Sequence, residues 1–325
     1  MKFLPDRLAA VAIAAVGTVG LQPAWAQAAD SSAGRCRVTA SGTAARLNRT
    51  LSVDEFRIRY ATEGPDALAD STDANGNGVP DVIDDLVIQL TTARSVYVDV
   101  LGLRHPLRQP RYRLAGAINV SVMAMAQGNG LAFDEVSREK PQDSAGGGDC
   151  ALSFAINSHL QPSRNITPAH ELFHLFQYGY AMFKTRWYLE GMTRWMETAF
   201  VDNSAVDRDA LRTRYARCED VFASPMSASP YWRMKARAAG RSGSARIPPA
   251  LLARTYVNGQ RVFSSPVFEG GRFALPVLEA LQKLSAEVAA QNGLPLYNWP
   301  EDMQRSNRFD AQICQTVEAL GSAPR

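Results

Sequence analysis

Two histidines separated by three residues, with a glutamate directly after the first, are the side chains best suited to metal chemistry. His170, Glu171 and His174 stand in the order H-E-x-x-H. On a helix, residues at positions i and i+4 lie on one face, so both imidazole rings can reach one ion. Imidazole nitrogens are good zinc ligands, and Glu171 is placed to take a proton from a zinc-bound water. The pattern predicts a catalytic zinc (Zn²⁺) site on a helix.

The alternative is a chance occurrence of this motif on an ordinary helix. The neighbouring residues Leu172, Phe173, Leu175 and Phe176 are all apolar, so much of the helix circumference must be buried. Burying two imidazoles and a carboxylate there is costly unless something satisfies them. The chain has only four histidines, and two of them form this pair. These observations favour a metal site.

The third zinc ligand must be a carboxylate. A catalytic zinc ion usually has three protein ligands and keeps its fourth position for water. No histidine follows His174 in the chain. Glu190 is the candidate, because a break at Lys184-Thr185 between two helices would fold it back over the first helix.

These two motifs carry a family resemblance. H-E-x-x-H followed by W-x-x-E-G-x-T resembles the glutamate-zincin group, which includes thermolysin-like peptidases and the zinc aminopeptidases. The resemblance implies that Glu190 is the third zinc ligand and that Glu197 orients a ligand histidine. A solvated helix carboxylate is the alternative for Glu197. The gap between His174 and Glu190 is shorter than in the aminopeptidases, so their substrate preference is not implied.

A wider resemblance covers residues 55–200. A strand, a Gly-Pro-Asp turn, a D-x-N-x-N-G-x-P-D loop, a long helix and further strands precede the two zinc motifs. This order resembles a group of secreted bacterial metallopeptidases that are known largely as predictions. It implies a zincin-like fold and a peptide or protein substrate, and it ends near residue 201.

Peptide hydrolysis also needs a donor for the oxyanion, which is usually a tyrosine or histidine in relatives of the group. Tyr188, Tyr215 and Tyr231 are the candidates, and we name Tyr231 as the possible donor. The strand expected at Ala151–Ile156 directly precedes the metal helix, so it could be the sheet edge that binds an extended peptide.

An Asp/Asn-rich segment has the spacing of an EF-hand calcium (Ca²⁺) loop, followed by a long helix. The ligand positions fall on Asp73, Asn75, Asn77, Val79 through its carbonyl, Asp81 and Asp84. Asp84 replaces the usual glutamate, and its shorter side chain would bind more weakly. The alternative is an Asn-Gly turn without metal. Bound calcium would brace the loop and the helix.

Residues 1–26 have the features of a secretory signal peptide. A basic start precedes an apolar run over residues 8–21, and Ala24-Trp25-Ala26 is a small-x-small cleavage site. A membrane anchor would need about 20 apolar residues, which is longer than this run. We expect a secreted or periplasmic protein, cleaved near Ala26, without a membrane span.

Cysteine use agrees with export. Two disulfides are expected in an oxidising compartment. Three pairings are possible, and the sequence does not choose among them. Wide spacing argues against a cysteine zinc site. The four residues are Cys36, Cys150, Cys218 and Cys314.

Composition excludes several classes of protein. With 46% hydrophobic and 21% charged residues, the chain is an ordinary folded protein rather than a disordered one or a coiled coil. Its formal net charge is +3, and loss of Lys2, Arg7 and Asp6 with the signal peptide leaves +2. That charge is too small to indicate a nucleic-acid partner.

Hydrophobic periodicity places the elements that must position these residues. Strands are expected at Phe56–Tyr60, within 112–125, at Leu131–Val136 and at Ala151–Ile156. Helices are expected at Val82–Leu101, Thr167–Phe183 with Thr167 as N-cap, Trp187–Val201, Asp207–Val221 and Phe273–Ala290. The segment 223–249 is expected to be a long loop.

Strands that precede helices indicate an α+β fold. We expect a small mixed or antiparallel sheet packed on the H-E-x-x-H helix, and a helical C-terminal part. The domains would be the signal peptide (1–26), a zincin-like catalytic domain with the calcium loop (27–205) and a mostly helical part (206–325).

The function that these residues predict is a secreted zinc-dependent peptidase. A second hypothesis is a non-catalytic secreted module for adhesion or scaffolding that binds calcium and zinc. Glu171 argues against it, because a purely structural metal site does not require that residue. A third hypothesis is a zinc hydrolase that acts on another bond.

Overall fold

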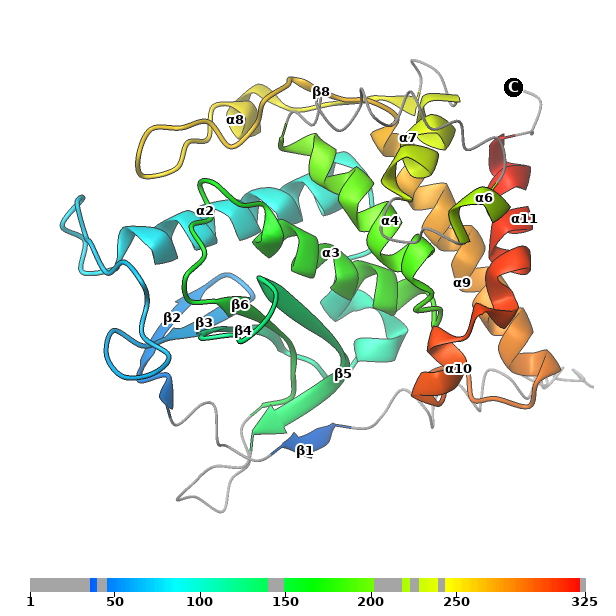
Figure 1. Cartoon of the computed structure of the whole chain (residues 1–325), viewed down its shortest axis with the longest axis horizontal. Coiled ribbons are helices and arrows are strands. Elements are labelled where there is room, and N and C mark those ends of the chain that lie inside the picture. The colour runs from blue at the N-terminus through cyan, green and yellow to red at the C-terminus, as the bar shows by residue number, and fades with distance from the viewer. Residues whose placement is uncertain are drawn as a thin grey trace, which may run out of the picture.

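A six-stranded sheet lies beside a set of helices in this computed structural model (Figure 1). The structure describes residues 36–39, 46–139, 149–201, 218–222, 228–238 and 243–321. The predicted α+β class is confirmed. The strands of the sheet are β1 (Arg37–Thr39), β2 (Arg49–Val53), β3 (Phe56–Tyr60), β4 (Ala117–Met123), β5 (Gly130–Glu139) and β6 (Ala151–Asn157).

Most helices follow the sheet in chain order, and the described residues after 206 are mostly helical. The α-helices are α2 (Asp81–Ser95), α3 (Thr167–Tyr180), α4 (Arg186–Met196), α6 (Glu219–Phe222), α7 (Ser229–Ala238), α8 (Pro249–Leu252), α9 (Ala274–Gln291), α10 (Glu301–Arg305) and α11 (Asp310–Gly321). Shorter turns are η2 (Val96–Val100), η3 (Pro106–Arg108), η4 (Pro110–Tyr112), η5 (Glu197–Ala199), η8 (Gly271–Phe273) and η9 (Asn307–Phe309). A small second sheet pairs β7 (Ala245–Arg246) with β8 (Val267–Phe268).

The main sheet is mixed and has the strand order β1-β5-β6-β4-β3-β2. Strand β6 lies between β4, which it meets in parallel, and β5, which it meets antiparallel. The expectation that residues 151–156 form the sheet edge is therefore wrong. After β4 the chain skips one strand position to form β5, and it then returns to form β6 in the position between β4 and β5. Chain order alone cannot show that return.

Strand β5 has the exposed edge nearest the metal motif. On one side it pairs with β6. On the other side it pairs with β1, and only at residues 137–139. Among the described strands, none pairs with the outer edge of residues 130–136, where the Ala132 backbone is hydrogen-bonded to Glu171 instead.

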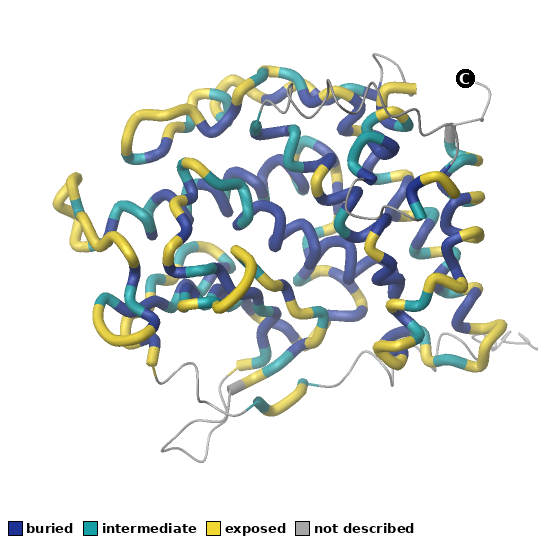
Figure 2. The backbone as a smooth tube through the Cα atoms, in the orientation of Figure 1, coloured by how far each residue is buried: buried dark blue, intermediate teal, exposed yellow. Residues whose placement is uncertain are grey.

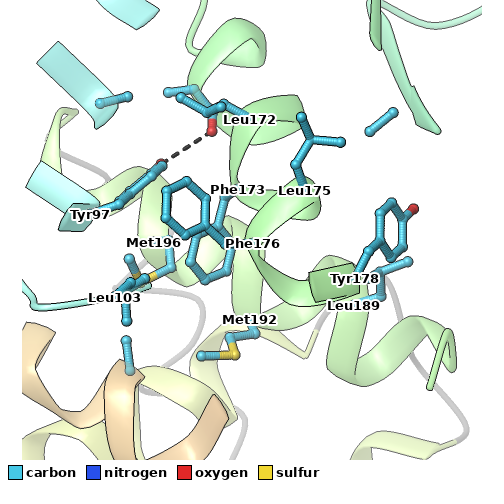
Figure 3. Close-up of a cluster of buried hydrophobic side chains, with 14 of the residues drawn as sticks. Tyr97, Leu103, Leu172, Phe173, Leu175, Phe176, Tyr178, Leu189, Met192 and Met196 are labelled. Atoms are coloured by element: carbon cyan, nitrogen blue, oxygen red, sulfur yellow. Dashed lines mark hydrogen bonds between the residues drawn. The ribbon is translucent and has the colours of Figure 1, made fainter. Parts of the chain in front are cut away.

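Helix α3 is enclosed by apolar side chains, and every residue of α3 after Thr167 is buried (Figure 2). The Tyr97 ring packs edge-on against Phe173 and Phe176, with ring centroids 5.2 and 5.4 Å apart (Figure 3). The Tyr97 hydroxyl donates to the Ala169 carbonyl at 3.1 Å. The predicted burial of the H-E-x-x-H helix is thus confirmed.

The boundaries of α3 differ from the expected ones. Thr167 is the first helical residue rather than the N-cap, and the Asn165 Oδ1 atom accepts from the Thr167 backbone N–H at 2.9 Å. The helix ends at Tyr180 instead of Phe183. Beyond it, the Met182 N–H donates to Ser285 Oγ at 3.2 Å and the Lys184 N–H to the Gln304 carbonyl at 2.7 Å. Hydrogen bonds to the C-terminal helices thus replace those that would have continued α3.

Other expectations are met to different degrees. The strand at Phe56–Tyr60 is confirmed, as are the long helices at α2 and α9. The predicted loop 223–249 is wrong in part, because it contains α7. In α7, Trp232 stacks on Trp187 of α4 and its Nε1–H donates to the Trp187 carbonyl at 2.9 Å. Most of the helix expected at 207–221 lies outside the described residues.

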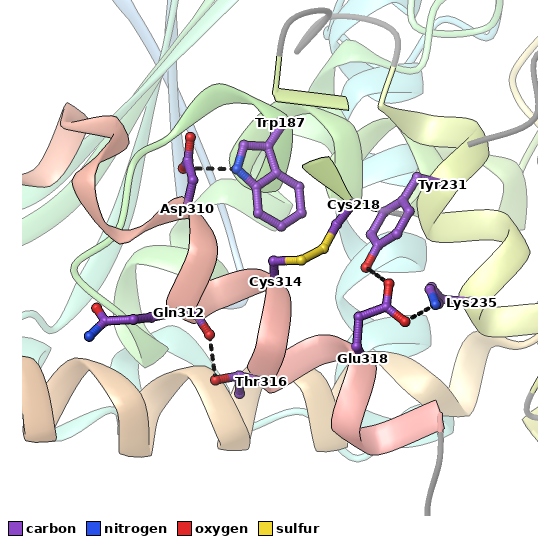
Figure 4. Close-up of a disulfide and its surroundings, with 9 residues drawn as sticks. All are labelled: Trp187, Cys218, Tyr231, Lys235, Asp310, Gln312, Cys314, Thr316 and Glu318. Atoms are coloured by element: carbon purple, nitrogen blue, oxygen red, sulfur yellow. Dashed lines mark hydrogen bonds and ion pairs between the residues drawn. A yellow bond between two sulfur atoms is a disulfide. The ribbon is translucent and has the colours of Figure 1, made fainter. Parts of the chain in front are cut away.

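The two disulfides show which of the three possible cysteine pairings forms. Cys36 pairs with Cys150 beside the sheet, and Cys218 pairs with Cys314 (Figure 4). The second bond joins the start of α6 to α11. Both pairs agree with a protein that matures in an oxidising compartment.

Among the described residues, no helix has the length and apolar character needed to cross a membrane. The expected signal peptide at 1–26 lies outside the described residues.

A buried ion cluster joins β5 to η4 and to the segment that follows α3. Asp134 on β5 contacts Arg111 Nη2 at 2.6 Å and Lys184 Nζ at 3.0 Å. Arg111 Nη1 also donates to the Tyr178 carbonyl at 2.7 Å, and Lys184 pairs with Glu301 at 2.6 Å. Burial acts to raise the pKa of Asp134, but Arg111 and Lys184 outweigh it and hold that pKa below its ordinary value.

Replacing this carboxylate tests the cluster. Asp134→Asn should lower the free energy of unfolding by about 3–5 kcal/mol at neutral pH, because two buried cations lose their shared partner. The folded-state pKa is depressed, so the stabilisation is present above about pH 4 and is lost as pH falls through the folded pKa. On acidification below that value, wild type should therefore lose more stability than Asp134→Asn. Urea unfolding at neutral and acidic pH measures both effects.

Asp149→Asn is the matched control. The Asp149 side chain is 77% exposed and its ion pair with Arg57 spans 3.2 Å. Removing an exposed pair should cost less than about 1 kcal/mol. Equal losses in the two variants would contradict a structural role for the buried cluster.

Candidate functional site

Three side chains converge where α3 and α4 pack against each other. The Nε2 atoms of His170 and His174 lie 3.0 Å apart. Glu190, from α4, places one carboxylate oxygen 3.4 Å from His170 Nε2 and the other 3.8 Å from His174 Nε2. The helical break between α3 and α4 thus brings the predicted third ligand to the two histidines. Their potential ligand atoms all lie within 4.8 Å of one another.

The outer nitrogens of both rings have hydrogen-bond acceptors. His170 Nδ1–H donates to Glu197 Oε1 at 2.6 Å, and His174 Nδ1–H donates to Gln177 Oε1 at 2.9 Å. The Gln177 amide is oriented by its Nε2 group, which donates to the Leu189 carbonyl at 3.1 Å. With the proton on Nδ1, each ring presents a bare Nε2 lone pair to the other.

This donor set fits a divalent cation. Two bare nitrogens and a carboxylate would repel one another at these distances without positive charge between them. Zinc–nitrogen bonds of about 2.0–2.1 Å can bridge the two rings. The contact of Glu197 with His170 has the form of the hydrogen bond that ligand histidines usually make to a carboxylate.

The pKa values within the cluster follow from burial and from the short distances between its ionisable side chains. Burial lowers the pKa of His170, but hydrogen bonds to Glu190 and Glu197 outweigh it and raise that pKa to about 9. Burial and the neighbouring His170 charge lower the pKa of His174 to about 4. Burial opposes ionisation of Glu190, yet the two histidines hold its pKa at about 2. Without a metal ion, a proton on His170 would therefore supply the positive charge beside an ionised Glu190 at neutral pH, and a bound cation would take the place of that proton.

Glu171 lies between α3 and the start of β5. Burial and the charge of Glu190 raise its pKa to about 7, against a hydrogen bond from the Ala132 backbone. Gly130 is pressed against it, since an added Cβ would lie 2.6 Å from Glu171 Cγ and Oε1 and 2.7 Å from Thr167 Cγ2. Only glycine at position 130 lets β5 approach the glutamate this closely.

An open cleft of about 780 Å³ runs over the cluster. Its walls come from the start of β5, the loop before α3, α3 itself, α4 and the end of α10. His170, Glu171, His174, Glu190 and Glu197 all line it. The cluster is therefore accessible to a ligand larger than an ion.

The tyrosines are placed differently from the expectation. Tyr231 is fully buried, and its hydroxyl donates to Glu318 at 3.0 Å, away from the cleft (Figure 4). Tyr188 is also buried and does not line the cleft, whereas Tyr215 lies outside the described residues. Tyr231 is thus wrong as the oxyanion donor. Tyr178 lines the cleft instead, with its ring stacked on His174 at 5.9 Å.

Sequence reasoning missed Tyr178, Gln177 and Gly130. Gln177 follows His174 by three residues and Tyr178 by four, which places both beside it on the helix. That spacing was available in the sequence. Nothing in the sequence marks Gly130, because its role depends on the approach of β5 to α3.

The predicted calcium loop is closed by its own side chains. Asp73 accepts from the backbone N–H groups of Asn77 and Gly78 at 3.1 and 2.8 Å. The amides of Asn75 and Asn77 both donate to Asp84 Oδ2, at 2.9 and 2.8 Å. Asp81 accepts from the Ala74 N–H at 3.1 Å, and Val79 follows in the same turn. Oxygen-rich residues therefore gather around one loop, although its three aspartates do not form a tight carboxylate cluster.

Comparisons with known proteins identify no relative. No protein-family model, no curated protein and no solved structure matches the chain. Functional assignment therefore depends on the geometry of these side chains.

The contact between Gly130 and Glu171 is testable by stability alone. Gly130→Ala should lower the free energy of unfolding by about 1–3 kcal/mol, because the added methyl overpacks the site. The loss should be smaller in a Glu171→Ala background, where two of the close atoms are gone. Urea unfolding of the four proteins measures this coupling. Gly116→Ala is the control, because its Cβ would meet no atom within 4 Å. Additive losses at 130 and 171 would contradict the close contact.

Proposed function

We propose that this protein is a secreted zinc-dependent peptidase of zincin-like fold. The observation that carries the proposal is the convergence of His170, His174 and Glu190 on one point. Each histidine is held by an acceptor on its far nitrogen, and an open cleft leads to the point. Three protein ligands in an open cleft favour a catalytic metal over a structural one, which usually has four.

The residues of the chain have separate tasks in this proposal. Zinc held by His170, His174 and Glu190 would polarise the scissile carbonyl and lower the pKa of its water. Glu171 accepts the water proton on its carboxylate and delivers it to the leaving amine. Tyr178, whose ring packs on His174, is the tyrosine placed to donate to the oxyanion.

The outer edge of β5 is the proposed seat of the peptide backbone. Gly130, Leu131 and Ala132 line the cleft, and Ala132 already donates its N–H to Glu171. An extended peptide added to this edge would have its scissile carbonyl beside the proposed metal ligands. This role replaces the one expected for β6.

Export is part of the proposal. The two disulfides favour an oxidising compartment, and the signal-peptide pattern at 1–26 supports secretion. The non-catalytic module remains the rival account. It would explain the zinc ligands but not the buried Glu171 at the base of an open cleft.

Metal content and turnover test the proposal together. Purified wild type should hold about one zinc ion per chain, and His174→Ala should hold none, by elemental analysis. Glu171→Gln should keep its zinc and lose at least about 100-fold in kcat/KM, because the proton acceptor is gone. The assay is mass spectrometry of a mixed peptide library after incubation.

Two outcomes would contradict the peptidase assignment. One is a folded, zinc-loaded wild type that cleaves no peptide, which leaves the non-catalytic module or a hydrolase of another bond. The other is equal cleavage by wild type and Glu171→Gln. Circular dichroism of each variant separates loss of chemistry from loss of fold.

We further propose structural calcium for the loop from Asp73 to Asp84. Support comes from the spacing of its oxygen ligands and from Gly78, whose φ of +84° gives the sharp turn that such a loop needs at this position. Helix α2 begins within the loop at Asp81, so an ion there would brace the first turn of that helix.

Calcium should raise the melting temperature of wild type. An ion at about 100 times its Kd adds roughly 2.7 kcal/mol to stability when it binds only the folded state. Asp73→Ala should abolish the calcium response measured by differential scanning calorimetry. Asp70→Ala is the matched control, since Asp70 is exposed and precedes the ligand positions. Absence of any calcium shift in wild type, with zinc held constant, would contradict the calcium proposal.

A further inference from the structure

The threonine that ends the W-x-x-E-G-x-T segment of α4 is buried beside the proposed metal ligands. Thr193 has an exposed fraction of 0%, and its Oγ atom lies 3.3 Å from His174 Nδ1. It follows Glu190 by three residues, so both side chains lie on the face of α4 that meets α3. A buried hydroxyl needs hydrogen-bond partners, and those of Thr193 lie next to the metal site.

The opposite face of the same segment fixes α4 from behind. The Trp187 ring stacks on Trp232 of α7 with centroids 5.7 Å apart. Gly191 follows four residues later, and an added Cβ there would lie 2.6 Å from Ala228 Cβ. Packing on this side leaves α4 little freedom, so the position of Thr193 relative to α3 is set by the core.

The carbonyl of Leu189 decides which way the Gln177 amide points. Gln177 Nε2 donates to this carbonyl at 3.1 Å. A carbonyl can only accept, so the amide nitrogen must face Leu189 and the amide oxygen must face His174. The reversed amide would bring two oxygens together at that distance. The orientation of Gln177 therefore follows from α4 and not from α3, on which the residue lies.

The Thr193 hydroxyl stabilises that orientation. Its Oγ atom lies 2.8 Å from Gln177 Oε1 and 2.7 Å from the Leu189 carbonyl oxygen. The hydroxyl has one proton to donate, and either oxygen can accept it. Both acceptors belong to the same arrangement of Gln177 against α4, so either hydrogen bond supports it.

The orientation of Gln177 sets the state of His174. Gln177 Oε1 lies 2.9 Å from His174 Nδ1 and can only accept, so that nitrogen must carry the ring proton. His174 Nε2 is then free to bind a metal ion. Leu189 directly precedes Glu190 in the chain. The turn of α4 that supplies the third proposed ligand thus also prepares the second.

His174 depends on this support more than His170 does. The partner of His170 Nδ1 is the Glu197 carboxylate at 2.6 Å, and hydrogen bonds to ionised groups are stronger than those between neutral groups. Gln177 is a neutral amide. His174 therefore relies on the correct orientation of its acceptor, and Thr193 contributes to that orientation.

We propose that Thr193 and Gln177 act together as positioning residues through which α4 sets the metal affinity of His174. The inference rests on the proposed function, because it takes His170, His174 and Glu190 as the zinc ligands. It assigns a role to the threonine of the W-x-x-E-G-x-T segment.

Zinc affinity tests this role without any measurement of turnover. Competition with a chromophoric chelator should show a zinc Kd about 10–100-fold higher for Gln177→Leu than for wild type, as expected when the partner of a ligand histidine is lost. Thr193→Val should raise the zinc Kd by at least about threefold, whereas Thr193→Ser keeps the hydroxyl and should stay within about twofold of wild type. Circular dichroism confirms that each variant is folded, so a merely structural role of Thr193 would leave the zinc Kd unchanged.

A double variant tests whether Thr193 acts through Gln177. Once Gln177 is replaced by Leu, the hydroxyl has no amide to orient, so adding Thr193→Val should change the zinc Kd little further. Independent effects would multiply instead, and that result would overturn the proposed joint action.

Thr316→Val is the matched control. Thr316 Oγ donates to the carbonyl four residues before it, that of Gln312, at 2.8 Å on α11 (Figure 4). Thr193 has the same relation to Leu189, but Thr316 does not line the cleft. Its substitution should leave the zinc Kd unchanged.

The outcomes separate this inference from the peptidase proposal. An unchanged zinc Kd in Thr193→Val, or an equal change in Thr316→Val, overturns the role of Thr193, and cleavage of peptides by wild type would still support the peptidase. Weaker zinc binding by Thr193→Val, without cleavage of any peptide by wild type, overturns the peptidase but supports the positioning role. A folded wild type that binds no zinc overturns both.

Discussion

The burial of three ionisable side chains on one apolar helix is the constraint on which the rest of this structure depends. Helix α3 carries His170, Glu171 and His174 into the core, where unpaired polar groups are costly. Each of the three has a specific partner: Glu197, the Ala132 backbone and Gln177. These partners come from η5, β5 and α3 itself. These three side chains therefore need contacts from both the sheet and the helices.

Helix α4 links that cluster to the C-terminal helices. Its buried face packs against α7, where Trp187 and Trp232 stack, and the Trp187 Nε1–H donates to Asp310 of α11. The Cys218–Cys314 bond holds α6 and α11 together beside this contact (Figure 4). Because the other residues of α4 are buried in the core, the charged residues of this helix face the cleft. The described C-terminal helices thus act on the candidate site by orienting α4, and none of their residues belongs to the group formed by His170, His174 and Glu190.

Local elements could be predicted where hydrophobic periodicity is strong. Prediction failed where contacts between residues far apart in the chain decide the structure. The strand at Phe56–Tyr60 alternates buried and half-buried residues, and α2 and α9 repeat their apolar residues at helical spacing, so sequence alone located them. Helix α7 was missed because its segment is rich in arginine and serine, although the helix buries Trp232 against Trp187 of α4. Strand β6 was placed correctly along the chain but wrongly in the sheet. Strand order depends on how β5 and β6 pair, and no local pattern records that.

By itself, the sequence located the side chains of the candidate site: the two histidines and Glu171 by their spacing on one helix, and Glu190 and Glu197 by their places after the break that follows it. Tertiary structure alone decided which groups complete it. Tyr231 lies in the core against Glu318, whereas Tyr178 lines the cleft, and Gly130 meets Glu171 from a strand far away in the chain. It also decided the disulfide pairing and the contact of Thr193 with Gln177. The physical reason is the same in each case: helical spacing is a local property of the chain, whereas packing between elements depends on contacts that sequence distance does not reveal.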